Sequence, residues 1–284
     1  MRKSVVVITG AAGGMGKACA RKFTDPDTLV LLVDLAQEPL QAVAEDLAAQ
    51  GFATSSLALD LSDPLSPQRI ADRVAELGMF RALIHTAGVW NVQAAPEQIF
   101  NVNYTATFNI LDALEPLLTR GSVAVCVASV GAHRRRGAAQ ADARMARNVP
   151  VTAAQLQAEL GSAFTSTVAY GLSKRGVLVE CERRAGAWGR QGARIVSISP
   201  GNIDTPMGRA GQKDGANMLV DAAIGSRSGS AEEVAELVDF LISEQAAYIT
   251  GCDIRVDGGA VANLRFGGPD EKFEAWDSQL DVFQ

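Results

Sequence analysis

The sequence predicts an α/β protein: a single doubly wound parallel sheet of about seven strands with helices on both faces. Three observations support this fold class. Short apolar runs recur along the chain, segments with helical spacing alternate with them, and the runs are apolar throughout instead of alternating with polar residues. Strands of that kind are buried on both faces, and their alternation with helices favours parallel neighbours joined by right-handed crossovers.

Each expected strand ends in small or polar residues. The seven strands are expected at 5–9, 29–34, 56–60, 81–88, 122–129, 193–199 and 252–256. Helices are expected between them, for example at 37–51, where Leu40, Val43 and Leu47 share one face, and at 66–78. No repeat, low-complexity tract or linker interrupts the alternation, so residues 1–284 are interpreted as one domain.

Two regions depart from this rhythm. Residues 131–165 have the pattern of two short helices around Pro150, inserted before a longer helix. Residues 260–284 form a C-terminal tail with four aromatic residues, Phe266, Phe273, Trp276 and Phe283. Such a tail is too aromatic for a solvated chain end. It is expected to cover either the functional site or a neighbouring subunit, and the sequence does not choose between them.

Charge and cysteine content narrow the classes of partner. The formal net charge is −6, which argues against a partner with a phosphate backbone, so no nucleic acid is expected. The one basic run, Arg134 to Arg136, is interpreted as a solvated turn. The four cysteines lie far apart without CxxC spacing, which is typical of reduced packing residues and not of a disulfide framework or a metal site.

The sequence shows no targeting or membrane segment. The chain passes from MRKS directly into the first expected strand, and this start is too short for a signal peptide. The longest apolar runs have strand length, whereas a bilayer span needs ~20 apolar residues. We therefore expect a cytoplasmic protein with no membrane partner.

A glycine-rich turn follows the first expected strand. The stretch TGAAGGMGK places Gly10, Gly14 and Gly16 where the strand passes into a helix. Gly10 would allow the sharp turn, Gly14 the approach of a pyrophosphate, and Gly16 the close packing of helix on strand, with the helix N-terminus facing the phosphates. Met15 lies in the same turn. This context predicts a Rossmann-type dinucleotide site.

The expected cofactor is NAD. Asp34 ends the second strand, 18 positions after Gly16, near the offset at which a carboxylate binds the adenosine ribose hydroxyls. It would repel a 2′-phosphate, and the three residues after it include no arginine to accept one. Asp60, followed by Leu61, is placed either to bind the adenine amino group or to cap a helix.

The motifs that follow resemble those of the short-chain dehydrogenase/reductase family. In chain order they are TGAAGGMG, HTAG, NVNYTATFN, Ser129, YGLSK and PGNIDTPM, and the resemblance covers residues 4–262. It implies a catalytic set of Ser129, Tyr170, Lys174 and Asn103. It also implies that Ala87 and Gly88 lie beside the adenosine ribose, and that the turn Pro200, Gly201, Ile203 and Thr205 covers the nicotinamide.

The family resemblance also gives the chemistry of TVAYGLSKRG. Tyr170 and Lys174 lie one helical turn apart on one face. The ammonium, together with the positive nicotinamide, would lower the pKa of the phenol so that Tyr170 exchanges a proton with the substrate oxygen. Ser129 would bond that oxygen, Lys174 would also hold the nicotinamide ribose, and Asn103 would anchor a water that links the lysine to solvent.

Two departures from the family pattern stand out. His85 replaces an asparagine of the usual N-N-A-G motif and is interpreted as a satisfied core residue. The 41 positions from Ser129 to Tyr170 exceed the roughly dozen usual in the family. A subgroup resembling bacterial 3α-hydroxysteroid dehydrogenase/carbonyl reductase carries a similar insertion. This implies a bulky apolar substrate, in a pocket bounded by Trp90, Val130, the insertion itself and the 206–228 loop with Met207, Met218 and Leu219.

We therefore expect an NAD-dependent enzyme, without a metal, that interconverts a secondary alcohol and a ketone, with a bulky, apolar, hydroxysteroid-like molecule as the preferred substrate. A reductase of small ketones, diketones or quinones is the first alternative, and a non-catalytic NAD-binding sensor is the second. The resemblance implies a homodimer or homotetramer. The insertion would either act as a lid or change the subunit contact made by the long helices at about 96–118 and 168–188.

Overall fold

The computed structural model describes residues 3–23, 25, 27–90, 94–134, 137–147, 149–211, 217–267, 270–278 and 281–282. Its centre is one parallel sheet in the order β3-β2-β1-β4-β5-β6-β7. The strands are β1 (Lys3–Thr9), β2 (Thr28–Asp34), β3 (Ala53–Ala58), β4 (Gly78–His85), β5 (Val123–Val127), β6 (Arg194–Pro200) and β7 (Asp253–Val256). The strand order reverses between β1 and β4, which creates the crevice where ligands bind in such sheets.

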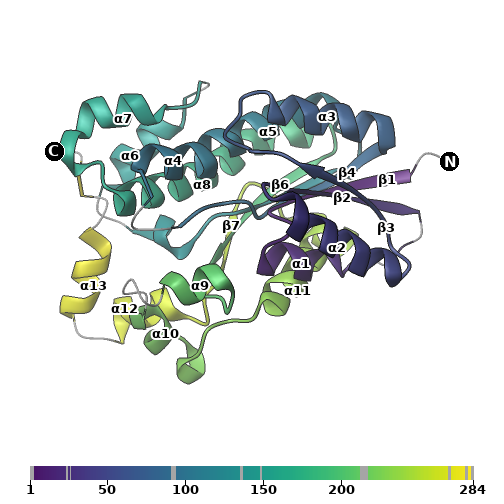
Figure 1. Cartoon of the computed structure of the whole chain (residues 1–284). Helices are drawn as coiled ribbons and strands as arrows, with labels where there is room; N and C mark the ends of the chain where they lie inside the picture. Colours follow the sequence, from purple (N-terminus) through teal and green to yellow (C-terminus); the bar gives the residue numbers. More distant parts are fainter. Residues whose placement is uncertain are drawn as a thin grey trace.

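Helices cover both faces of the sheet (Figure 1). One face carries α1 (Gly14–Ala20), α2 (Gln37–Ala49) and α11 (Ala231–Ile242). The other carries α3 (Ser66–Leu77), α5 (Ala106–Leu114) and α8 (Ser166–Arg190). The predicted fold class is therefore confirmed, since alternate residues of each central strand contribute to different cores.

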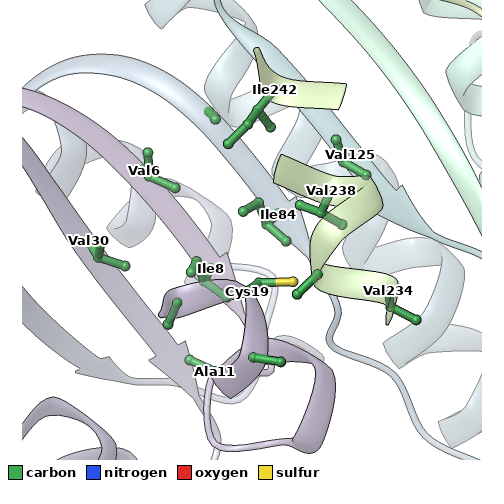
Figure 2. Close-up of a cluster of buried hydrophobic side chains, with 14 of the residues drawn as sticks. Val6, Ile8, Ala11, Cys19, Val30, Ile84, Val125, Val234, Val238 and Ile242 are labelled. Carbon is green, nitrogen blue, oxygen red and sulfur yellow. The ribbon is translucent and has the colours of Figure 1, made fainter. Parts of the chain in front are cut away.

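The β1 strand shows how the sheet divides two cores. Val6 and Ile8 belong to the cluster shared with α1 and α11, whereas Val5 and Val7 belong to the opposite cluster. Figure 2 shows the first of these, where Val234, Val238 and Ile242 of α11 and Cys19 of α1 meet Ile84 of β4. All four cysteines are free, and Cys19, Cys126 and Cys181 are buried.

The remaining helices lie beyond the carboxyl ends of the strands or on the outer side of α8. They are α4 (Pro96–Phe100), α6 (Ala138–Met145), α7 (Ala153–Leu160), α9 (Pro206–Gly211), α10 (Asn217–Ala222), α12 (Ala260–Phe266) and α13 (Asp270–Asp277). A π-helical turn, Asn101–Thr105, joins α4 to α5. None of the described helices combines the length and the apolar character that a membrane span requires.

The insertion forms the two expected short helices, and they pack on the long helices. Its apolar side chains, including Met145 of α6 and Leu156 of α7, share one cluster with Phe100 and Tyr104 on one side and Leu172 of α8 on the other. Arg175 of α8 secures the contact through an ion pair with Asp142 of α6. No described residue of 137–165 lines the cavity considered below, whereas Gly131 and Arg134, at the start of the insertion, do.

Candidate active site

A cavity of about 770 Å³ opens at the carboxyl ends of the strands. The loops after β1, β2, β4, β5 and β6 contribute to its walls, as the switch-point rule requires. Most residues that the sequence analysis selects line it: Gly10, Gly14, Met15, Asp34, Asp60, Leu61, Ala87, Gly88, Ser129, Tyr170, Lys174, Pro200, Gly201, Ile203 and Thr205. Gly16 and Asn103 lie behind this wall.

The glycine-rich turn is closely packed against the sheet. Gly10 has φ +67°, in the left-handed region, and a Cβ on Gly16 would lie 2.2 Å from the Gly10 carbonyl oxygen. These two glycines therefore allow the turn and the close packing of α1, as expected. A Cβ on Gly14 would lie 2.5 Å from Cγ2 of Thr205, so the space beside Gly14 is occupied by the loop that follows β6.

Two carboxylates line the cavity beside this turn. Asp34 accepts hydrogen bonds from the Ala12 N–H at 2.8 Å and from its neighbour Leu35 at 2.7 Å, and these bonds fix the carboxylate at the end of β2. Asp60 is exposed and accepts from the backbone and hydroxyl of Ser62. Among the described residues that line the cavity, no lysine or arginine follows β2 or β3. With the glycine turn, this end of the cavity is where the adenosine half of a dinucleotide would lie.

Ser129, Tyr170 and Lys174 meet at the centre of the cavity. Ser129 caps the turn after β5 by accepting from the Gly131 N–H at 3.1 Å, and its side chain also hydrogen-bonds Tyr170. Thr165 caps α8 and so fixes the start of the helix that carries the other two side chains. Lys174 Nζ lies 6.0 Å from the centre of the Tyr170 ring.

Burial shifts both titratable groups of this trio. It raises the pKa of Tyr170, against the hydrogen bond from Ser129 and the charge of Arg134, which lower it. It lowers the pKa of Lys174 to about 8. The charge of Arg134 thus acts on the phenol from the side of the β5 loop. Lys174 donates to the Val127 carbonyl at 2.9 Å.

Asn103 lies in the π-helical turn, and its side chain hydrogen-bonds the backbone of Val89. Its side-chain oxygen accepts from the Val89 N–H at 2.8 Å, and its amide donates to the Val89 carbonyl at 3.0 Å. A Cβ on Gly88 would lie 3.0 Å from that oxygen and 3.1 Å from Lys174 Nζ. Asn103 therefore holds the backbone at Gly88 and Val89, which lines the cavity beside Lys174, while Asn103 itself does not line it.

His85 is the buried, satisfied residue that the sequence predicts. Nδ1 lies 2.7 Å from the Thr9 hydroxyl and Nε2 lies 2.8 Å from the Thr107 hydroxyl. Thr107 donates its only hydroxyl proton to the Asn103 carbonyl, so Nε2 must be the protonated nitrogen and Nδ1 the acceptor. Burial, with the charge of Lys174, lowers the pKa of His85 to about 3.

The substrate end is apolar. The expected residues Trp90, Val130, Met207, Met218 and Leu219 all line the cavity. The Trp90 ring meets the Tyr170 ring edge-on at a centroid distance of 4.6 Å. This wall therefore positions the phenol and offers apolar contact to a ligand beside it.

The C-terminal tail completes this wall. Trp276 of α13 lines the cavity, and it packs with Phe273, Val130, Val261 and Leu264 in one cluster. Of the two locations that the sequence leaves open, the tail therefore covers the site of its own chain. Phe266 is exposed, and Phe283 lies outside the described residues.

The interpretation of Arg134 as part of a solvated turn is wrong. Its exposed fraction is 8%, and it lines the cavity beside Ser129 and Tyr170. Nε donates to the Trp276 carbonyl at 2.9 Å and Nη1 to the Gly131 carbonyl at 2.8 Å. Arg134 is buried by contacts to the C-terminal tail, more than a hundred positions away, and the residues near Arg134 in the sequence do not predict these contacts. Arg135 and Arg136 lie outside the described residues.

A doubly wound sheet with a serine, a tyrosine and a lysine at one switch-point cavity defines a class of nicotinamide-dependent oxidoreductases. Comparison with protein families agrees. Residues 4–141 match the model described as short chain dehydrogenase, and residues 139–261 match the model described as enoyl-(acyl carrier protein) reductase. The chain belongs to the short-chain dehydrogenase/reductase family and is an oxidoreductase of CH–OH groups.

Curated relatives span almost the whole chain. The short-chain dehydrogenase/reductase bsc3 of Alternaria brassicicola is 32% identical over 273 residues, which cover 93% of this chain and 98% of the relative. The D-threitol dehydrogenase of Mycolicibacterium smegmatis is 30% identical, with coverages of 90% and 92%. The 3-alpha-hydroxysteroid dehydrogenase/carbonyl reductase of Comamonas testosteroni is 27% identical, with coverages of 92% and 98%.

Solved structures share the fold. Levodione reductase matches with a TM-score of 0.72 at 24% identity, over 90% of this chain and 96% of that one. A blue fluorescent protein from a metagenomic library, solved in complex with NADPH, matches with a TM-score of 0.73 at 21% identity, over 90% and 97%.

Proposed function

We propose that this enzyme uses NAD to interconvert a secondary alcohol and a ketone on a bulky apolar skeleton. The observation that carries the proposal is the convergence of Ser129, Tyr170 and Lys174 on one cavity whose other end presents Asp34. The bound nicotinamide would exchange a hydride with the carbinol carbon. The residues of the chain would move the proton and bind the oxygen.

Tyr170 is the proton carrier in this proposal. Its hydroxyl already hydrogen-bonds Ser129, so one hydroxyl proton of the pair lies between the two side chains and the other can donate to a substrate oxygen that joins them. Burial keeps the phenol protonated before ligands bind, and a phenol in that state can donate to a ketone. In the oxidative direction, Tyr170 must lose its proton first. The positive charges of Lys174 and Arg134 in the same cavity favour that loss.

NAD is proposed over NADP because of the charges beside the glycine-rich turn. Asp34 is a carboxylate, and a 2′-phosphate placed near it would meet repulsion, with no cation among the described lining residues after β2 or β3. Asp34 is also held in place by two backbone N–H groups, so it cannot easily turn away.

The bulky apolar skeleton is proposed from the substrate wall. Two tryptophans, two methionines, a leucine and a valine line that end of the cavity. Such a wall offers more apolar contact than a small alcohol can use, and it would favour ligands of ring size or larger. The printed name of the Comamonas relative, a hydroxysteroid dehydrogenase, agrees with this substrate class.

The test follows absorbance at 340 nm with NAD+ or NADP+ and a graded series of secondary alcohols, from 2-propanol through cyclohexanol to a 3-hydroxysteroid. We expect NADH formation that increases with ring size. Activity on small alcohols alone would discard the bulky substrate and favour the small-ketone reductase, and a preference for NADP+ would overturn the cofactor assignment.

The proton carrier is tested by Tyr170→Phe. We expect turnover to fall by about a hundredfold or more, with NAD binding, measured by calorimetry, changed by less than about twofold. Tyr248→Phe is the matched control because it removes the same hydroxyl from a fully exposed ring. Unchanged turnover in Tyr170→Phe would reject the mechanism. NAD binding by a wild type that turns over nothing would favour the sensor.

A further inference from the structure

Arg134 is a buried cation at the substrate end of the cavity, and the proposed reaction uses only its charge, through its effect on Tyr170, and none of its hydrogen-bond donors. Its side chain comes from the loop after β5, whereas the two carboxylates that line the cavity follow β2 and β3, on the far side of β1 and β4. Among the described lining residues, no acidic side chain lies on the substrate side with it.

The Arg134 side chain is fixed by Trp276 of α13 and by Gly131 of its own loop. The Trp276 ring lies 5.3 Å from the guanidinium carbon, and the Trp276 and Gly131 carbonyls accept from Nε and Nη1. A Cβ on Gly131 would lie 3.1 Å from Arg134 Nη1, 3.5 Å from Ser129 Oγ and 3.6 Å from a Tyr170 ring carbon. The guanidinium, the serine hydroxyl and the phenol ring therefore surround one glycine.

The guanidinium is only partly satisfied. It has five N–H donors, and the hydrogen bonds formed within the described part of the chain use two of them, both to neutral carbonyls. Asp277 lies near enough for its charge to raise the pKa of Arg134, but it does not line the cavity. A buried cation without a direct anionic partner is costly, and an incoming anion would remove part of that cost.

We propose that Arg134 binds an anionic group of the substrate, a carboxylate carried on an apolar skeleton whose alcohol or ketone lies at Ser129 and Tyr170. A planar guanidinium binds carboxylate with two parallel hydrogen bonds, and a dry apolar wall strengthens such a pair. The inference rests on the proposed function for the position of the reacting oxygen. It adds the polar group that would orient the substrate within an otherwise apolar pocket.

Two other roles for Arg134 make different predictions. If it only fastens α13 over the cavity, loosening α13 elsewhere should have the same effect as removing the guanidinium. If it only adjusts the pKa of Tyr170, its loss should affect charged and neutral ligands alike. The structure favours substrate binding because the Arg134 side chain lines the cavity. To fasten α13 it would need only its hydrogen bond to the Trp276 carbonyl.

The experiment measures binding without turnover, so it does not depend on the hydride chemistry. Cyclohexanecarboxylate and 2-naphthoate are titrated by calorimetry into the full-length protein, with and without NAD+, against their neutral carboxamides. We expect each carboxylate to bind about ten- to a hundredfold more tightly than its amide. In Arg134→Leu that preference should disappear, while Arg134→Lys should keep part of it because the charge remains without the planar fork.

Phe273→Ala is the control for the clamp. Phe273 belongs to the cluster that docks α13 but does not line the cavity. We expect this variant to keep the preference for carboxylate. The inference is overturned by equal affinities of acid and amide in the wild type, by a preference that survives in Arg134→Leu, or by a loss in Phe273→Ala as complete as that in Arg134→Leu. The alcohol screen and Tyr170→Phe test the proposed function separately.

Discussion

Lys174 Nζ donates to the main-chain carbonyl of Val127 at 2.9 Å, and this bond ties the middle of α8 to the end of β5. The lysine is nearly inaccessible to solvent, and burial lowers its pKa to about 8 from an ordinary value of 10.5. The charged form of Lys174 therefore lowers the free energy of unfolding, and the protein is less stable for keeping this residue in its active site, as is common where function and stability compete.

Replacing Lys174 with methionine should stabilise the protein at neutral pH while abolishing turnover. Between pH 8 and 10.5 the unfolded chain keeps a proton that the folded chain has lost, so the free energy of unfolding rises with pH across that window. In Lys174→Met the gain at pH 7 should be on the order of 2 kcal/mol and should shrink toward pH 10.5. Guanidinium unfolding at pH 7, 8.5 and 10 measures it. A lower free energy of unfolding in Lys174→Met than in the wild type at pH 7 would contradict the conclusion that the buried charge destabilises the fold.

His85 should make the fold sensitive to acid. Its pKa of about 3 lies below the ordinary value of 6.5, so between these values the unfolded chain binds a proton that the folded chain does not. Stability should therefore fall as the pH drops from 6.5 toward 3. At pH 7, His85→Asn should have a free energy of unfolding about 1 kcal/mol below that of the wild type, because one hydrogen bond to a threonine is weakened. On acidification its free energy of unfolding should fall less than that of the wild type. Urea unfolding from pH 7 to pH 4 checks this, and parallel curves for the two proteins would show that another group causes the acid loss.

Much of the fold follows from the sequence because the central strands are apolar on both faces. Strands such as β1 and β5 have nearly every residue buried, so their composition alone locates them. Two strands begin three residues before their expected starts. The edge strand β3 spans Ala53–Ala58 instead of 56–60, because all six of its residues are half-buried and three of them are threonine or serine. The central strand β4 spans Gly78–His85 instead of 81–88.

The glycine turn, Asp34 and the pair Tyr170 and Lys174 follow from local motifs, and the structure places all of them in one cavity. Arg134 and Trp276 do not follow from any motif. Each acquires its position from the other across 142 positions of sequence. The side chains that shape the substrate end therefore depend on how the tail docks, which a pattern of nearby residues does not report.

Gly16 should tolerate no side chain. A Cβ there would lie 2.2 Å from the Gly10 carbonyl oxygen, and its three nearest atoms all belong to the backbone of Gly10 and Ala11, so no flexible side chain can yield. We expect Gly16→Ala to destabilise the protein by about 1–3 kcal/mol and to weaken NAD binding through the displaced turn. Gly189→Ala is the matched control, an exposed position near the end of α8 with nothing within 4 Å of the added carbon. It should gain up to about 1 kcal/mol. Thermal unfolding and NAD calorimetry compare the two, and equal effects would refute the steric argument.

Asp34 should set the choice between NAD and NADP. Its carboxylate is held at 2.8 Å by the Ala12 N–H, at the end of β2, where a dinucleotide in this cavity would place its adenosine ribose. Removing the charge in Asp34→Ala takes away an acceptor for the 2′-hydroxyl and the repulsion of a 2′-phosphate. We expect NAD to bind about tenfold more weakly and NADP more tightly than to the wild type.

The control for this discrimination is Asp60→Ala, which removes the second carboxylate beside the same turn. Asp60 hydrogen-bonds Ser62, and it is expected either to bind the adenine amino group or to cap a helix. Since neither role involves the ribose, its loss should leave the ratio of the NAD and NADP affinities unchanged. Calorimetric titration of NAD and NADP into the wild type and both variants gives the ratio of affinities directly. If the ratio changes in Asp60→Ala and not in Asp34→Ala, the carboxylate that excludes the phosphate lies after β3 and not after β2.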